Sequence, residues 1–482
     1  MAAAAAAVLF PALLTGAAAA SARAPAAAGA GAPASGGTWG RAQRVPGLPR
    51  NTGNAETVSV SCPFAGNCDA AGFYTGKGRH FQAFVVSEVN GVWGKAQEVA
   101  AALNTGRQAR ATSVSCASAG NCSAGGQYKD GSGRYQAFAV SQVNGAWGKA
   151  REVPGTAVLN AGGGAQLESV SCASPGNCSA TGDYANASGR TKTFVVSQRD
   201  GSWGTAREIP GLAVLSAGGN AAVDELSCGS AGNCAVGGSY SNNNVSGPSQ
   251  AFIASQRSGV WGTAREVPGT AALNAGGSAE TTSVSCAAAG NCGAGGVYTD
   301  RSGHGQAFVV GESSGTWGTA EEVPGTATLN AGGSAHTASV SCGSAGNCGA
   351  GGSYTDKAGH SQAFVVSQKN RVWGKALEVP GTAALNAGGF ADTHAISCTS
   401  AGNCGAGGGY NDSGANNQAF VVSEVNGVWE KALEVPGSAA LNTGAFAEVY
   451  SVSCASAGNC GAGGLYQNAS GVFQAFVVAE TG

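Results

Sequence analysis

The chain is poor in charged residues and in the apolar residues that fill helical cores. Lys, Arg, Asp and Glu make up only 11% of its 482 residues, and 25 basic against 27 acidic side chains leave a formal net charge of −2. Nucleic-acid-binding proteins carry a basic face that neutralises phosphates, so this even, near-neutral balance predicts no nucleic-acid partner. The apolar share is mostly Ala and Val, with little Leu, Ile or Met, which argues against a Leu-rich helical core.

Long apolar runs are missing beyond the first two dozen residues, so no membrane span is expected. Residues 1–22 are Ala-rich with a short apolar centre, and Ala20-Ser21-Ala22 is typical of a signal-peptide cleavage site. No Lys or Arg precedes Arg23, which leaves a plain Ala-rich tail as the alternative. Residues 23–37 predict an Ala/Gly/Pro-rich linker. We therefore expect a signal peptide, a linker and a single domain over residues 38–482.

Glycine is abundant, with 81 residues, and it belongs to a repeat of about 56 residues that starts at Trp39. One unit contains Trp-Gly-x-Ala-x-Glu-Val-Pro-Gly, then Ser-Val-Ser-Cys, Gly-Asn-Cys-x-Ala-Gly-Gly-x-Tyr and Gln-Ala-Phe-Val-Val-Ser. These four runs are rich in strand-forming residues and are separated by Gly, Asn, Asp and Ser, which predicts four strands per unit. The eight tryptophans recur in register: Trp39, Trp93, Trp147, Trp203, Trp261, Trp317, Trp373 and Trp429.

The repeated unit predicts an all-β fold, an eight-bladed β-propeller of four-stranded antiparallel blades. Pairs such as Asn90-Gly91 suit a two-residue hairpin turn with positive φ, and Asn370-Arg371 departs from this pattern at some cost. Residues 83–86 are apolar on both alternating faces, so their strand should be covered on both sides. We place the Ser-Val-Ser-Cys strand innermost and the Trp strand outermost.

The two ends of the chain predict how the ring closes. The repeats begin at a Trp strand (Trp39) and end at a Phe-Val-Val strand (residues 476–478), which are joined by a hairpin in every other unit. Pairing the N-terminal Trp strand with the C-terminal strand would leave no open sheet edge. The alternative is an open solenoid, which would require capped end repeats.

All 16 cysteines form eight pairs with Cys-x5-Cys spacing. Zinc sites favour closer spacing or nearby histidines, and the chain has only five His, so we expect disulfides and no metal. Disulfides require an oxidising compartment, which agrees with a secreted, extracellular protein. The expected bridges join Cys62 to Cys68, Cys116 to Cys122, Cys172 to Cys178, Cys228 to Cys234, Cys286 to Cys292, Cys342 to Cys348, Cys398 to Cys404 and Cys454 to Cys460.

At Ser-Val-Ser-Cys-x5-Cys-x-Ala-Gly-Gly and Ser-x-x-Asn-Gly-x-Trp the chain resembles secreted bacterial Cys-containing β-propeller repeat proteins and, more distantly, the sialidase/Asp-box (BNR) propellers. The resemblance covers Trp39 to the C-terminus. An Asp box reads Ser-x-Asp-x-Gly-x-Thr-Trp, whereas residues 87–93 are one residue shorter and lack the Asp. The arginine triad and the Tyr/Glu pair of sialidases have no counterparts that can be mapped here. The resemblance therefore implies a fold and not a catalytic activity.

Candidate functional residues are those that differ between repeats, because a feature present in every unit is normally architectural. The variable positions lie six and four residues before the first Cys of each pair, where each inner strand begins. Such residues would surround one end of the central channel, unless they merely vary at exposed loop ends. Glu168 and Asp224, on adjacent blades, are the sharpest acidic pair. The candidate binding residues are Glu56, Arg110, Glu168, Asp224, Glu280, His336, Asp392, His394 and Glu448.

The sequence favours a secreted, non-catalytic binding propeller, plausible partners being polysaccharide or cell-surface ligands. A glycan-active hydrolase or lyase at the channel is the first alternative, and a structural surface repeat protein is the second. No cofactor is expected, no catalytic residue is assigned, and a monomer is expected. Whether the protein is an enzyme stays open at this point, although a binding protein is favoured.

Overall fold

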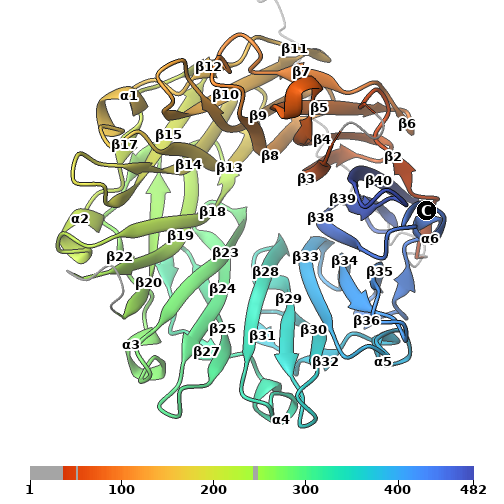
Figure 1. Cartoon of the computed structure of the whole chain (residues 1–482). Coiled ribbons are helices and arrows are strands. Elements are labelled where there is room, and N and C mark those ends of the chain that lie inside the picture. The colour runs from red at the N-terminus through yellow and green to blue at the C-terminus, as the bar shows by residue number, and fades with distance from the viewer. Residues whose placement is uncertain (1–35, 50–52, 243–247) are drawn as a thin grey trace, which may run out of the picture. The chain divides into compact units, whose positions relative to one another are not determined.

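The computed structural model describes residues 36–49, 53–242 and 248–482. The predicted signal peptide and residues 23–35 of the predicted linker lie outside the described residues. The described chain forms eight β-sheets arranged around a central channel (Figure 1). The prediction of an eight-bladed β-propeller is therefore confirmed.

Each blade is an antiparallel sheet whose strands follow one another from the channel outwards, as in the order β3-β4-β5-β6. The innermost strands carry the Ser-Val-Ser-Cys sequence and its variants, as predicted. They are β3 (Ala55–Phe64), β8 (Ala109–Ser118), β13 (Ala165–Ser174), β18 (Ala221–Ser230), β23 (Ala279–Ala288), β28 (Ala335–Ser344), β33 (Ala391–Ser400) and β38 (Ala447–Ser456). The second strands are β4 (Asn67–Thr75), β9 (Asn121–Lys129), β14 (Asn177–Ala185), β19 (Asn233–Ser241), β24 (Asn291–Thr299), β29 (Asn347–Thr355), β34 (Asn403–Asn411) and β39 (Asn459–Gln467).

The third strands carry the Phe-Val-Val sequence and are covered on both faces. They are β5 (Phe81–Val89), β10 (Tyr135–Val143), β15 (Thr191–Arg199), β20 (Ser249–Arg257), β25 (Gly305–Ser313), β30 (Ser361–Lys369), β35 (Asn417–Val425) and β40 (Phe473–Thr481). Their phenylalanines are at most 1% exposed: Phe84, Phe138, Phe194, Phe252, Phe308, Phe364, Phe420 and Phe476. Each hydrophobic core combines side chains of two neighbouring blades, so no blade buries its faces alone.

The outermost strand of each blade is interrupted, which the sequence analysis did not anticipate. Its two halves pair with the same third strand, and the Trp-Gly-x-Ala sequence lies at the interruption. The halves are β6 (Val92–Trp93) and β7 (Gln97–Val99), β11 (Ala146–Trp147) and β12 (Arg151–Glu152), β16 (Ser202–Trp203) and β17 (Arg207–Glu208), β21 (Val260–Trp261) and β22 (Arg265–Glu266), β26 (Thr316–Trp317) and β27 (Glu321–Glu322), β31 (Val372–Trp373) and β32 (Leu377–Glu378), β36 (Val428–Trp429) and β37 (Leu433–Glu434), and β1 (Thr38–Trp39) and β2 (Gln43–Arg44).

The ring closes as the two chain ends predicted. β1 pairs antiparallel with β40, with Trp39 opposite Glu480, and β2 pairs with the same strand. The last blade is thus built from β38, β39 and β40 together with β1 and β2 from the other end of the chain (Figure 1). We number the blades by their inner strands, from blade 1 (β3) to blade 8 (β38).

Short connections join each outer strand to the next inner strand. Six of these connections contain one helical turn, whereas a 3-10 turn, η1 (Lys77–Arg79), lies between β4 and β5 of blade 1. The helices are α1 (Thr156–Leu159), α2 (Leu212–Leu215), α3 (Thr270–Leu273), α4 (Thr326–Leu329), α5 (Thr382–Leu385) and α6 (Ser438–Leu441). Among the described residues, no helix has the length and apolar character that a membrane crossing requires.

The serines of Ser-Val-Ser-Cys join neighbouring blades. The hydroxyl of Ser61 accepts a hydrogen bond from the backbone N–H of Cys116 in the next blade, at 2.9 Å. The same bond recurs at all eight seams, the last being Cys62 N–H to Ser453. The first serine of the motif makes a similar bond, as between Val114 N–H and Ser59 at 3.1 Å. These two rings of hydrogen bonds hold the inner strands together around the channel.

All eight predicted disulfides are present, and each clips the turn between the inner and second strands of one blade. No free cysteine occurs in the described residues. The bridges join the expected partners: Cys62 to Cys68, Cys116 to Cys122, Cys172 to Cys178, Cys228 to Cys234, Cys286 to Cys292, Cys342 to Cys348, Cys398 to Cys404, and Cys454 to Cys460.

The second cysteine of every bridge belongs to a hydrophobic core and not to an accessible site. These side chains begin the second strands and are only 3–7% exposed, so they pack where neighbouring blades meet. The bridges therefore have a structural role, as the repeat predicted. The buried cysteines are Cys68, Cys122, Cys178, Cys234, Cys292, Cys348, Cys404 and Cys460.

The predicted hairpin turns are also present, between the third strand and the first half of the outer strand. Asn90 has a φ of 50° and Gly91 a φ of 79°. Arg371 adopts a φ of 69°, the left-handed conformation expected of it.

Candidate functional site

All nine candidate residues lie on inner strands, at the end of the channel where these strands begin. We call this end the channel mouth. Every inner strand has a register shift there, between the residues five and three before its first Cys, as between Thr393 and Ala395. An extra residue in a strand re-aims the neighbouring side chains. The bulge therefore presents His394 of the candidate set towards the channel.

A glycine explains why the strand can bulge at this place. A Cβ added at Gly408 on the second strand would lie 1.8 Å from the carbonyl oxygen of Asp392. The same contact recurs in the other blades, as between Gly126 and the carbonyl of Arg110 at 2.0 Å. Only glycine allows such a close approach of two backbones. The recurring Gly-Gly-x-Tyr sequence thus serves to position the variable residues opposite it.

The channel itself is a polar cavity of about 360 Å³, lined mainly by serines of the inner strands. His394 is the member of the candidate set that lines this cavity, together with Glu225 and Tyr450. The other eight candidates lie around the mouth. Most of them belong to two groups of interacting side chains, which we call arcs. Arg110 lies between these two arcs.

The first arc spans blades 6 to 8. His336 Nε2 lies 3.6 Å from Asp392 Oδ2, and His394 Nε2 lies 3.8 Å from Glu448 Oε2. The His394 and Tyr450 rings contact edge to face, with centroids 5.7 Å apart. Each contact joins one blade to the next, so this arc is a continuous polar surface.

The protonation of the first arc follows from its burial. Burial lowers the pKa of His336 below its usual value, so its imidazole is neutral at pH 7. Burial, followed by opposing effects of His394 and Glu448, raises the pKa of Asp392 to about 6. The contact between His336 and Asp392 at pH 7 is therefore one between a neutral ring and a carboxylate.

The second arc is acidic and spans blades 3 to 5. The side chain of Gln166 donates a hydrogen bond to Glu168, and Ser239 donates one to Glu280 at 3.3 Å. Asp183 accepts a hydrogen bond from Val223 N–H at 3.1 Å. The carboxyls of Glu168, Glu280 and Asp183 also interact electrostatically with that of Asp224.

Protein atoms packed around the Asp224 carboxyl, followed by the nearby carboxyls of Glu280 and Glu168, raise its pKa to about 8, although the residue is exposed at the mouth. Burial first, then Glu168, raises the pKa of Asp183 well above its ordinary value. Burial also raises the pKa of Glu168. At pH 7 the Asp224 carboxyl is consequently mostly protonated, and in that form it both donates and accepts hydrogen bonds.

Arg110 stands between the two arcs as a fixed cation. Its guanidinium lies over the rings of Phe73 and Phe81, 4.4 and 4.5 Å from their centroids. Such cation–π contacts hold the charge in place. Burial raises the pKa of neighbouring Glu56, and the charge of Arg110 opposes this.

Three acidic residues in or near the blade seams were not among the candidates chosen from the sequence. Asp183 lies on a second strand, opposite Gln166 in the register, whereas only inner-strand positions were compared. Glu225 replaces a serine of the inner-strand motif and accepts the same interblade bond, from Val284 N–H at 3.1 Å. Asp69 follows the second Cys of its pair, where the other units have Ser, Ala or Gly. Comparing every column of the repeat for its single acidic residue would have found Asp183 and Asp69.

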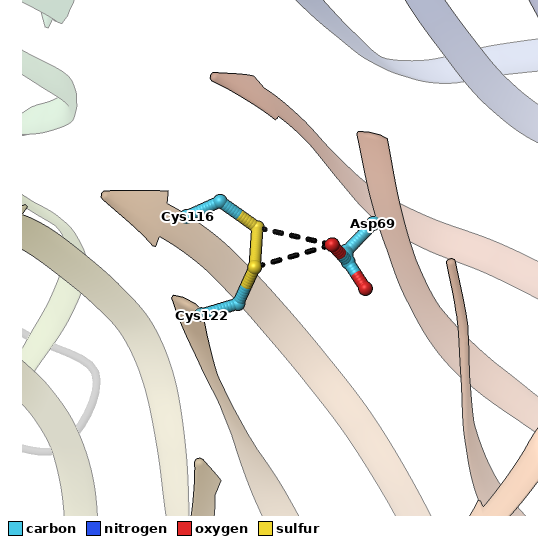
Figure 2. A group of neighbouring side chains, drawn as sticks. All are labelled: Asp69, Cys116 and Cys122. Carbon is cyan, nitrogen blue, oxygen red and sulfur yellow. Dashed lines mark hydrogen bonds between the residues drawn. A yellow bond between two sulfur atoms is a disulfide. The ribbon is translucent and has the colours of Figure 1, made fainter. Parts of the chain in front are cut away.

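Asp69 lies away from the mouth, against the disulfide of the next blade (Figure 2). Its Oδ2 is 3.5 Å from Cys116 Sγ and 3.2 Å from Cys122 Sγ. Disulfide sulfurs carry no hydrogen, so these are S···O contacts and not true hydrogen bonds. Ser87 and Gln142 donate hydrogen bonds to the other oxygen, Oδ1. Burial dominates and raises the pKa of Asp69 to about 7.

Asp69 with these two cysteines is the one group of three potential metal ligands within 4.8 Å of one another among the described residues. The sulfurs are bonded to each other and lack the thiolate that a metal requires. The carboxyls of the acidic arc do not converge in this way. The contacts observed at the mouth are hydrogen bonds, close His–carboxylate pairs and a ring contact.

No protein-family model and no curated protein matches the chain. Solved structures that resemble it include the propeller domain of the Trilobed protease from Pyrococcus furiosus, with 6% identity over 78% of this chain and 97% of that one and a TM-score of 0.43. A Hadza microbial sialidase covers 72% and 73% at 10% identity, with a TM-score of 0.37. A PL25 ulvan lyase covers 93% and 96% at 9% identity, with a TM-score of 0.38. At these values, nothing about activity or substrate follows from the resemblance.

Proposed function

We propose that this protein is a secreted, monomeric, non-catalytic propeller that binds a polyhydroxylated ligand, a polysaccharide or a cell-surface glycan, at the channel mouth. The observation that carries the proposal is the mouth itself. Successive blades contribute carboxyls, imidazoles and a phenol that contact one another across the seams, and a guanidinium held over two phenylalanine rings. Such a surface offers hydrogen-bond donors and acceptors in many directions, as sugar hydroxyls require.

The proposed export rests on two observations. Residues 1–22 have the composition of a signal peptide, and eight disulfides need an oxidising compartment to form. Expression of the full chain in a bacterial host, followed by N-terminal sequencing of the secreted protein, tests this. Retention of the whole chain in a reducing cytoplasm with free thiols would contradict it.

A glycan array tests the binding site. We expect retained glycans to be lost in the Glu168→Gln and Asp224→Asn variants, which remove carboxyls without changing their size. Ser132→Ala, at an exposed turn, is the control and should bind as the unaltered protein does. Equal binding by all four proteins would exclude the mouth as the site.

A glycan-active enzyme is the second candidate, because the Glu168 carboxyl contributes to the raised pKa of Asp224. Glycosidases use two carboxyls held in different protonation states. Turnover of a fluorogenic glycoside panel that disappears in Asp224→Asn would favour the enzyme. Binding without turnover favours the binding protein, and no binding at all leaves a structural repeat protein.

A further inference from the structure

Two equivalent clefts lie on the outer part of the propeller, at the seams between blades 2 and 3 and between blades 3 and 4. Their volumes are about 510 and 420 Å³, within the range of ordinary ligand pockets. Each is lined by the third strand of one blade, by its interrupted outer strand and by the tryptophan of the next blade, Trp203 or Trp261. The same parts of the repeat thus form both clefts.

The interruption of the outer strand explains how the clefts arise. At seam 3/4 the third strand β15 pairs with β16 at Gln198 and Arg199 and with β17 at Phe194 and Val195. Residues 204–206 lie between these pairings. Val196 and Ser197 therefore have no complete outer strand beside them, and both line the cleft.

The tryptophans at these seams are more open than most of the others. Trp203 and Trp261 are half-buried, whereas Trp39, Trp93, Trp317, Trp373 and Trp429 are 5–8% exposed. The indole Nε1 of Trp203 has no hydrogen-bond partner among the described residues. At seam 4/5 the corresponding Nε1 of Trp317 donates to Ser255 at 2.9 Å.

Each cleft also holds two exposed cations with no ionic partner among the described residues. At seam 3/4 they are Arg199 and Arg207, and at seam 2/3 they are Lys149 and Arg151. The single acid of the seam 3/4 cleft, Glu208, accepts a hydrogen bond from Tyr184. Each cleft therefore has an excess of one positive charge.

At the next seam the equivalent arginine has an ionic partner. Arg257 occupies the position of Arg199 one blade later and lies 3.7 Å from Glu312 of the following blade. At seam 3/4 the place of Glu312 is taken by Gln256, which is 2% exposed and lines the cleft. The Oε1 of Gln256 accepts no hydrogen bond from any described residue. A neutral residue here leaves Arg199 free and a buried polar atom unused.

We propose that the two clefts are subsites for an anionic polysaccharide that runs across both seams on the outer surface. An indole face packs on the apolar face of a sugar ring, and arginine binds carboxylate or sulfate through paired N–H donors. Two adjacent subsites suit a ligand that repeats, because the second contact then forms within the same complex. This inference concerns a surface distinct from the channel mouth and does not rest on it.

Three labelled dextrans that differ only in charge test the proposal. Short fluorescein-labelled chains of dextran, carboxymethyl dextran and dextran sulfate are titrated with the full secreted protein at low salt, and their anisotropy is measured. We expect one or both charged dextrans to bind, and the comparison between them identifies carboxylate or sulfate. Plain dextran should bind at least about tenfold more weakly, because it lacks the groups that arginine binds.

Variants of exposed cations locate the binding without endangering the fold. The combined Lys149→Ala, Arg151→Ala, Arg199→Ala and Arg207→Ala variant should bind about tenfold more weakly, and either half of it should lose less. The control, Arg257→Ala with Arg265→Ala, removes the equivalent cations of seam 4/5, where Arg257 already contacts Glu312, and should leave the affinity within about twofold. Trp203→Phe with Trp261→Phe should abolish the ligand-induced change in tryptophan emission.

The outcomes separate this inference from the proposed function. Equal binding of plain dextran, absence of binding by all three dextrans, or an equal loss in the control would overturn the inference. Loss of binding only in Glu168→Gln and Asp224→Asn would assign the dextrans to the channel mouth and overturn it as well. Loss in the cleft variants alone supports the clefts, whatever the glycan array shows for the mouth.

Discussion

Two side chains, Asp69 and Glu88, place ionisable groups in the buried seams between blades. Asp69 faces the disulfide of blade 2, where blades 5 to 8 have glycines whose added Cβ would lie 2.6–2.8 Å from the nearest sulfur of the next blade. Glu88 is 3% exposed, and its Oε2 has no partner among the described residues. Neither residue has a counterpart of the same kind in all repeats, so both act locally.

Asp69 should make the stability of the protein depend on pH. Unfolded aspartate ionises near pH 3.9, whereas burial raises the pKa of Asp69 to about 7. Between these values the folded protein holds a proton that the unfolded chain has lost, so the free energy of unfolding falls as pH rises. Asp69→Asn should remove this slope and gain up to about 4 kcal/mol at pH 8.

Urea unfolding at several pH values gives the free energy of unfolding of the unaltered protein and of Asp69→Asn. The difference between the two values cancels the contributions of other titrating groups. Parallel curves for the two proteins between pH 4 and 8 would show that Asp69 ionises normally in the folded state.

Glu88 has no serine donor, unlike the glutamates at the same place in blades 7 and 8. Ser367 donates to Glu424 at 2.6 Å and Ser423 donates to Glu480 at 2.8 Å, each across a seam. At the seam between blades 8 and 1 the corresponding residue is Ala479. Ala479→Ser should supply the donor and stabilise the protein by about 1 kcal/mol.

Thermal unfolding measures this gain, and Ser423→Ala is the matched opposite change, with an expected loss. A lower unfolding temperature for Ala479→Ser would mean that the hydroxyl does not reach Glu88.

At the scale of the strand, the inner strands are joined by side chains and not by a continuous backbone ladder. Ser285 accepts from Cys342 N–H at 2.9 Å, and its equivalents complete the ring at every seam. The second ring is formed by the first serine of the motif, and Glu225 replaces this serine in blade 4. In blade 7 the residue is Ala395, whose side chain cannot accept a hydrogen bond from Val452 N–H. The seam between blades 7 and 8 is thus one bond short.

Changing these two positions tests the role of the rings. Ser285→Ala leaves a backbone N–H without its acceptor and should cost about 1–2 kcal/mol. Ala395→Ser should recover about 1 kcal/mol by completing the second ring. Chemical denaturation measures both, and no change in either variant would show that water satisfies these amides equally well.

The repeat pattern predicted the strands, their order, the disulfides and the hairpins, because the sequence signal for each of them recurs along the chain. The outer-strand interruption was missed, since Trp-Gly-x-Ala-x-Glu reads as one extended run. The nine candidate residues lie near the beginnings of inner strands, and their contacts depend on seams between blades that the sequence does not show. Asp183 illustrates this. It lies on β14, and only the pairing of β14 with β13 brings it near Glu168. Arg199 and Arg257 have the same place in the repeat and differ only because Gln256 and Glu312 follow in the neighbouring blade.

At the scale of the whole molecule, closure depends on a short segment. β1 and β2 cover the outer edge of β40, and Trp39 is 7% exposed in the core of the last blade. Deletion of residues 1–49 should bare this edge, which invites pairing with another chain. We expect oligomers or a loss of several kcal/mol of stability relative to a chain beginning at residue 36.

Light scattering coupled to size-exclusion chromatography, with thermal unfolding, checks this expectation. A monomer of unchanged stability after the deletion would show that the remaining strands close the ring unaided.

The pairing of β1 with β40 also fixes the order of events during biosynthesis. β1 and β2 are synthesised before the other strands of the propeller. They cannot pair until β40, its last strand, has been translated. A nascent or prematurely terminated chain therefore holds blades but no finished circle. The circle can therefore close only after β40 has been synthesised, because its last blade combines strands from both ends of the propeller.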